Sequence, residues 1–216
     1  MAGDPPPGRD THKKTLAASE RNEAERAAWR AAVARRDPQQ VVFLDETSTH
    51  TSLTRRYGWA PHAQRATGSV PRNHGKNTTL VAVLTPEGLH EPWMIEGAMN
   101  TMNTETFAWY IREQVAPRLR PGQVVVLDNV SVHRAASIHE ALAQRPGEAL
   151  FLPPYSPDFT PIEQAFSKLK AIARGIGART QEALQEAVRL AVEAITRDDA
   201  TAWFAHAGYL LPAQPI

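Results

Sequence analysis

Residues 151–163 read FLPPYSPDFTPIE and lead directly into QAFSKLK at residues 164–170. Four prolines lie within residues 153–161, where each fixes its own φ angle and disfavours helix in the residue before it. The pattern predicts a short apolar strand, then a stiff turn, then a helix with Thr160 as its N-cap and Pro161 in its first turn.

This predicted helix carries a carboxylate close to its start. Its apolar residues recur at helical spacing and form one buried stripe, made of Ile162, Phe166 and Leu169. Glu163 lies about 100° around the helix from that stripe, which suggests a chemical role. Two structural alternatives stay open. Thr160 and Glu163 match a capping box, and the prolines match a polyproline ligand for a partner's groove.

Composition bounds the class of protein. A chain of 216 residues that is 42% apolar can bury one substantial core, with room for a helical appendage. The absence of cysteine excludes a disulfide framework and thiolate metal sites, and fits a reducing compartment. No apolar run approaches the ~18 residues of a membrane span, and no signal peptide is recognisable. We therefore expect a cytoplasmic protein with no membrane partner.

The order of elements predicts an α/β fold. Residues 1–14 are typical of disorder, and residues 16–36 favour a linker or docking helix with Trp29 and Val33 on one face. We expect buried strands at 41–44, 124–127 and 149–152, a hairpin at 78–85 and 89–95, a short edge strand within 55–61, and helices at 104–115, 133–144, 180–195 and 201–210. Strands joined through helices pair in parallel and the hairpin adds antiparallel pairs, so the sheet is mixed and flanked by helices.

Acidic residues follow the predicted strands. Asp45 follows the first, Asp128 the second, and the third leads to Glu163. Since the ends of parallel strands converge on one sheet edge, the three carboxylates can meet there, although an acid after a strand is commonly only a solvated boundary. Divalent cations with oxygen ligands relieve the repulsion of such a cluster, and two of them support phosphodiester displacement. No cysteine nucleophile, nucleophile elbow or phosphate-binding glycine loop is present.

Two segments are basic and lack acids. The first lies between Glu46 and Glu87 and the second between Glu163 and Glu182. Each is a candidate DNA-phosphate surface, with an ordinary basic loop and a solvated helix face as the respective alternatives. Their cations are Arg55, Arg56, Arg65, Arg72 and Lys76 in the first, and Lys168, Lys170, Arg174 and Arg179 in the second.

Four motifs together resemble the catalytic domain of the mariner-superfamily DDE transposases, in their bacterial insertion-sequence branch. They are LDET at 44–47, YGWAP at 57–61, VLDN at 126–129 with His133, and LPPYSPDFTPIE at 152–163. The resemblance covers about residues 40–207 and includes the spacing of the last two acids, which have 34 residues between them as in the glutamate-bearing branches. It departs at Thr160, where the family usually has asparagine, and at Phe166, where tryptophan is common.

The resemblance implies a ribonuclease-H-like fold with an N-terminal helical linker. It implies that Asp45, Asp128 and Glu163 are catalytic and bind two Mg²⁺ ions, for which Mn²⁺ substitutes. Water then hydrolyses a phosphodiester at the transposon end, and the freed 3′-OH attacks target DNA. Candidate groups for supporting the acids or contacting DNA are Asn129, His133, Arg55, Arg56, Lys168 and Lys170, with a helix cap and a surface imidazole as the alternative roles of the first two.

The resemblance also sets expectations for organisation and partners. We expect a disordered N-terminus and linker helix at 1–38, a catalytic domain at 39–210 and a tail at 211–216. Full-length relatives carry helix-turn-helix domains ahead of the catalytic domain, so the chain is predicted to be a catalytic half that works with a separate helix-turn-helix subunit. We expect a homodimer on DNA, associated with the nucleoid. The alternatives are an inactive DNA-binding or regulatory fragment and a cellular nuclease or resolvase.

Overall fold

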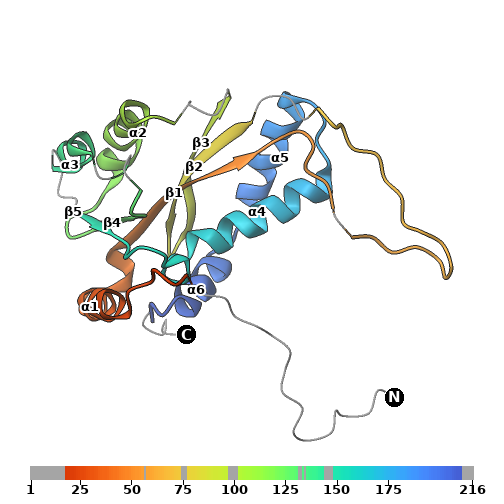
Figure 1. Ribbon diagram of the computed structural model, residues 1–216. Coiled ribbons are helices and arrows are strands. Elements are labelled where there is room, and N and C mark those ends of the chain that lie inside the picture. The colour runs from red at the N-terminus through yellow and green to blue at the C-terminus, as the bar shows by residue number, and fades with distance from the viewer. Residues whose placement is uncertain are drawn as a thin grey trace, which may run out of the picture.

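The computed structural model describes residues 18–55, 57–73, 77–96, 102–130, 133, 135–143 and 148–210. Its centre is a mixed five-stranded sheet in the order β3-β2-β1-β4-β5 (Figure 1). The parallel members are β1, β4 and β5, while β1, β2 and β3 pair antiparallel. The strands are β1 (Val41–Thr49), β2 (Thr78–Thr85), β3 (Gly88–Glu96), β4 (Val124–Leu127) and β5 (Glu148–Phe151). The prediction of a mixed sheet is confirmed.

Helices cover both faces of the sheet (Figure 1). One face packs against α1 (Glu23–Val33), α4 (Ile162–Ile176), α5 (Gln181–Glu193) and α6 (Arg197–His206). The other packs against α2 (Thr104–Tyr110), which continues into a π-helical turn at Ile111–Val115, and against α3 (Ala136–Ala143). No helix among the described residues is long and apolar enough to cross a membrane.

Alternation along β1 and β4 assigns each side chain to one of the two cores. Val41 and Phe43 lie in the core under α4, whereas Val42 and Leu44 lie in the core under α2. The same alternation in β4 places Val124 and Val126 under α4. Successive strand residues point to opposite faces, so the core membership of each valine fixes the face of the residues that follow it.

Several predicted boundaries differ from those of the structure. The first strand continues past Leu44 to Thr49 because β2 pairs with it along its outer half. The third strand is not fully buried, because β5 forms the sheet edge. The described part of 55–61 contains no strand. The structure also changes the bounds of three helices, which were predicted at 16–36, 133–144 and 201–210 and correspond to α1, α3 and α6. Residues 1–17 and 211–216 lie outside the described residues.

Helix α1 contacts both the core under α4 and the turn before α4. Trp29 and Val33 are buried in the core under α4, and the buried Arg26 donates to both carboxylate oxygens of Asp158, at 3.0 and 2.6 Å. Trp29 also stacks on Phe159, with the ring centroids 5.3 Å apart. The helix therefore packs directly on the proline-rich turn that precedes α4.

Candidate functional site

The register of β1 and β4 brings two aspartates to the same level on the same face. Val41 pairs with Val124 and Phe43 with Val126, so two residues further along each strand Asp45 and Asp128 lie side by side. Both have the parity of the face under α4, and Ala82, the cross-strand partner of Asp45, lies in that core. The prediction that Asp45 follows the end of its strand is wrong, because Asp45 lies within β1. It is nevertheless level with the point where the shorter β4 stops.

The third acid comes from the helix that covers this face. The buried stripe predicted for α4 is confirmed, with Ala165 and Ala173 as further members, and α4 packs across β1. Glu163, in the first turn of α4, is exposed. The capping box does not form, because α4 begins one residue later than predicted, with Pro161 as its N-cap and no side-chain cap hydrogen bond. Thr160 is buried in the turn before it.

All three acids line one cleft of about 430 Å³. The cleft lies between the end of β4, the proline-rich turn and the start of α4, and its other lining residues are Asn129, Val130, Leu152, Pro153, Pro154, Tyr155, Ser156, Pro157 and Thr160. Pieces far apart in the chain therefore form a single open, acidic site.

The environment of Asp45 is electrostatically costly for a carboxylate. Burial raises the pKa of Asp45 to about 7, and the charges of Asp128, Glu163 and Glu46 add to that effect. The amide of Glu46, which donates to Oδ1 of Asp45 at 2.7 Å, acts in the opposite direction. The repulsion expected of clustered carboxylates is thus present, and a bound cation would remove it.

A fully buried histidine connects the two sides of the sheet. His133 Nδ1 contacts Oδ1 of Asp128 at 2.5 Å, and Nε2 contacts Oε2 of Glu46 at 3.2 Å. Its ring stacks on Phe107 with a centroid distance of 4.2 Å. Since both carboxylates accept, both ring nitrogens donate and the ring is an imidazolium. The surface-imidazole alternative is wrong, and Asn129 lies in the cleft, seven residues before α3, where it caps no helix.

The charges of this bridge stabilise each other. Burial by itself would lower the pKa of His133, but the hydrogen bonds to Asp128 and Glu46 outweigh it and raise the pKa to about 9. Burial would likewise raise the pKa of Asp128, yet His133 and the amide of Val130 hold that pKa below its usual value. Both of these bonds end at Oδ1 of Asp128, and no hydrogen bond to its Oδ2 occurs among the described residues.

The donor set of the cleft fits a hard divalent cation. Its charged oxygen donors are three carboxylates, and Mg²⁺ generally takes only one or two of these, with waters and substrate phosphates as its remaining ligands. Within the described ranges, no group of three or more His, Asp or Glu side chains is arranged to hold a metal ion. The cleft therefore has three carboxylates in its lining but, among the described residues, no closed protein cage for a metal ion.

The predicted cations occupy different positions relative to the cleft. Lys170 lies on α4 two turns beyond Glu163, and burial lowers its pKa although the charges of Glu163 and Asp45 raise it. Lys168 instead pairs with Asp199 of α6. The guanidinium of Arg55 lies against Gly175 near the far end of α4, Arg179 donates to the carbonyls of Thr51 and Leu53, and Arg56 lies outside the described residues.

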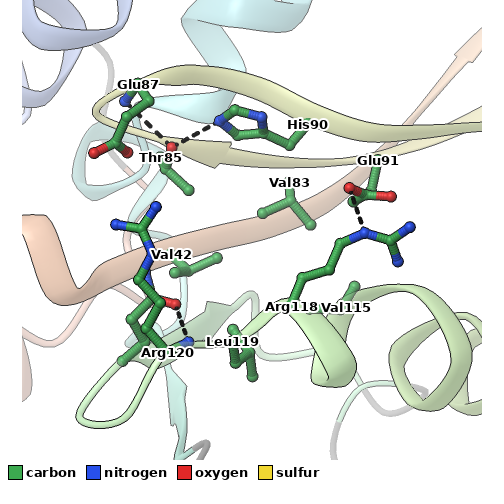
Figure 2. Close-up of a pocket in the computed structure, with 11 residues that line it drawn as sticks. Val42, Val83, Thr85, Glu87, His90, Glu91, Val115, Arg118, Leu119 and Arg120 are labelled. Atoms are coloured by element: carbon green, nitrogen blue, oxygen red, sulfur yellow. Dashed lines mark hydrogen bonds and ion pairs between the residues drawn. The ribbon is translucent and has the colours of Figure 1, made fainter.

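A second cavity of about 210 Å³ lies on the face covered by α2 (Figure 2). Its apolar wall includes Val42 and Val83, and an ion pair between Arg118 and Glu91 with an N–O distance of 2.9 Å crosses its rim. None of the predicted site residues lines it, and of its two carboxylates, Glu87 and Glu91, the latter is paired with Arg118. The candidate site is the acidic cleft.

Comparison with known proteins agrees with this fold. The structure resembles the Mos1 transposase paired-end complex with left transposon end, at a TM-score of 0.71 and 17% identity over 93% of this chain and 64% of that chain. It also resembles the Mos1 strand transfer complex (TM-score 0.70, 17% identity, 94% and 63% covered) and the Mos1 catalytic domain with Raltegravir and Mg (TM-score 0.59, 15% identity, 85% of each chain covered). The ribonuclease-H-like fold is thereby confirmed.

The extent of these matches differs between chains. The present chain spans 64% of the Mos1 chain in the paired-end complex. No curated protein gave a significant match. A family model described as "DDE superfamily endonuclease" matches residues 40–185, which include Asp45, Asp128 and Glu163. The chain belongs to the DDE superfamily endonucleases.

Proposed function

We propose that the chain is a metal-dependent DNA transposase. Its cleft hydrolyses a phosphodiester at a transposon end, and the freed 3′-OH is then joined to target DNA. The observation that carries the proposal is the convergence of Asp45, Asp128 and Glu163 on one open cleft, in a chain of this endonuclease family. The Mos1 complexes, which contain transposon ends or represent strand transfer, support the same substrate class.

In this proposal Asp45 and Asp128 hold divalent ions and Glu163 completes the second ion's site. Bound ions would lower the pKa of the attacking hydroxyl and stabilise charge on the leaving oxygen. Mg²⁺ is the proposed physiological ion with Mn²⁺ as its substitute, as solved Mos1 structures with each metal suggest. The exposed position of Glu163 leaves its carboxylate available to the substrate side of the cleft.

His133 has a positioning role in this proposal. By holding Oδ1 of Asp128 it orients the carboxylate so that the other oxygen is available to a cation. Its positive charge offsets the negative charges of Asp128 and Glu46, which lowers the electrostatic cost of gathering acids at this edge of the sheet. Partners of this kind that orient a metal ligand typically contribute about 10–100-fold to metal affinity.

A nicking assay tests the proposed function. Supercoiled plasmid incubated with the purified chain should be converted to the open circular form in Mg²⁺ or Mn²⁺ and remain supercoiled in EDTA. An oligonucleotide ending in a free 3′-OH should in addition become covalently joined to plasmid. Nicking without joining would favour a nuclease of the same fold, and DNA binding with neither reaction would favour an inactive fragment.

We propose that the active form pairs two copies on DNA, as the paired-end assembly of Mos1 suggests.

Two lysines of α4 provide a matched pair for testing the DNA surface. Lys170→Met should weaken DNA binding and reduce the slope of log affinity against log salt by about 1, since one phosphate contact is lost. Lys168→Met should leave that slope unchanged, because Lys168 is already paired with Asp199. Fluorescence anisotropy with a labelled duplex at several salt concentrations measures both. Equal slopes for the two variants would contradict a phosphate contact at Lys170.

A further inference from the structure

A tyrosine with a left-handed backbone lines the acidic cleft. Tyr155 has a φ of 56°, a conformation that costs free energy in residues other than glycine and asparagine. Its side chain is 55% exposed, although Ser156, Phe159 and Thr160 around it are buried. Core packing therefore does not explain why this conformation is adopted, and such residues cluster at ligand sites.

The turn that presents Tyr155 is held from several directions. Pro154 precedes it, and the Ser156 hydroxyl donates to the Pro154 carbonyl at 3.2 Å. Further along the turn, Asp158 is held by Arg26, and the Phe159 carbonyl accepts from the hydroxyl of Tyr209 at 2.7 Å. The backbone that carries the ring is thus fixed before any ligand arrives, which reduces the entropy that binding would cost.

The surroundings of the ring select the kind of ligand. Tyr155 shares the cleft with prolines, Leu152 and the exposed Val130, while the three carboxylates of the same cleft repel phosphate in the absence of a cation. An aromatic ring beside proline rings offers a flat apolar surface, which matches the face of a nucleobase. In an intact duplex these faces are covered by neighbouring bases, so the fitting ligand is an unpaired base.

We propose that Tyr155 stacks on an unpaired nucleobase adjacent to the phosphodiester on which the carboxylates act. The inference rests on the proposed function for its substrate and adds a recognition element to it. The chain should accordingly prefer DNA that is frayed or forked at the reacting position over fully paired DNA.

The test uses the whole chain and two DNA probes in Ca²⁺. One probe carries 2-aminopurine as an unpaired base at a fork, and the other carries it within a paired duplex. The unmodified chain should bind the fork about tenfold more tightly than the duplex and quench its fluorescence, a preference within the range of one base–aromatic stack. Tyr155→Phe keeps the ring and should retain both properties. Tyr155→Asn removes the ring while tolerating positive φ, and should lose both.

The outcomes separate this inference from the proposed function. Quenching and fork preference that persist in Tyr155→Asn would overturn the stacking role, as would their loss in Tyr155→Phe. Thermal unfolding of each variant checks the fold, and Tyr155→Gly, which relieves the positive φ, serves if the Asn variant unfolds. Plasmid nicking in Mg²⁺ is measured in parallel. If the chain nicks DNA but its binding does not depend on Tyr155, only the stacking inference is refuted. If quenching depends on Tyr155 but the chain does not nick DNA, only the proposed reaction is refuted.

Discussion

Asp128→Asn should reduce Mg²⁺-dependent nicking by about a thousandfold or more, because a lost metal ligand removes several kcal/mol of transition-state stabilisation. The fold should persist, since an asparagine Oδ1 still accepts from His133 and from the amide of Val130, as Oδ1 of Asp128 does. DNA binding in EDTA should also change little. Initial nicking rates over a range of Mg²⁺ concentrations, with thermal unfolding as a check, provide the measurement.

Two control variants distinguish a metal ligand from a structural carboxylate. Asp198→Asn makes the same chemical change at an exposed acid of α6 and should leave nicking unchanged. Asp128→Cys introduces a thiol into a chain that has none, and its nicking should recover in Mn²⁺ more than in Mg²⁺, because Mg²⁺ is the harder ion. Undiminished Mg²⁺-dependent nicking by Asp128→Asn would refute the assignment of Asp128.

The placement of the two aspartates follows from information that the sequence contains. In each of two parallel strands, four apolar residues are followed by an aspartate, which is Asp45 in one and Asp128 in the other. The register between β1 and β4 puts these two aspartates at the same level. The face was predictable too, because alternation within 41–45 and 124–128 gives both acids the same parity. Local patterns of this kind determine which side chains can meet, as they do in the stripe of α4.

The interactions that complete the site were not predictable, because their partners are distant in the chain. His133 reaches Glu46, which is 87 residues away, and Arg26 reaches Asp158, which is 132 residues away. No periodicity reports such contacts, so His133 had the surface imidazole as an open alternative. The signal that could have indicated it is its place five residues after Asp128, close enough in a loop to reach back to that carboxylate.

The length of β1 and the start of α4 illustrate a second limit. Apolar runs report burial on both faces, so the run that ends at Leu44 marks where the core ends, while β2 keeps the polar residues to Thr49 in the sheet. At α4 the Thr160-x-x-Glu163 spacing satisfies the capping-box pattern. The box does not form because α4 begins after Pro161, which is its N-cap in place of Thr160, and Glu163 is left to the cleft.

Phe159→Ala should lower the free energy of unfolding by about 3–5 kcal/mol, as truncation of a buried phenylalanine generally does. The ring is 1% exposed, it stacks on Trp29, and the guanidinium carbons of Arg26 and Arg30 each lie 3.9 Å from its centroid. Loss of these contacts should lower the unfolding midpoint by roughly 6–20 °C for a chain of this size. Thermal and urea unfolding of the purified variant measure the change.

Phe151→Ala is the matched control, because Phe151 is only partly buried at the end of the edge strand β5 and its truncation should cost clearly less. Phe159 also lies between Tyr155 and Glu163, so below its unfolding midpoint Phe159→Ala should still nick DNA more slowly than Phe151→Ala does. That difference would arise because the loosened turn no longer holds both cleft residues in place. Equal unfolding midpoints for the two variants would show that the packing of α1 on Phe159 does not stabilise the turn. Equal nicking rates would show that nicking does not depend on this packing.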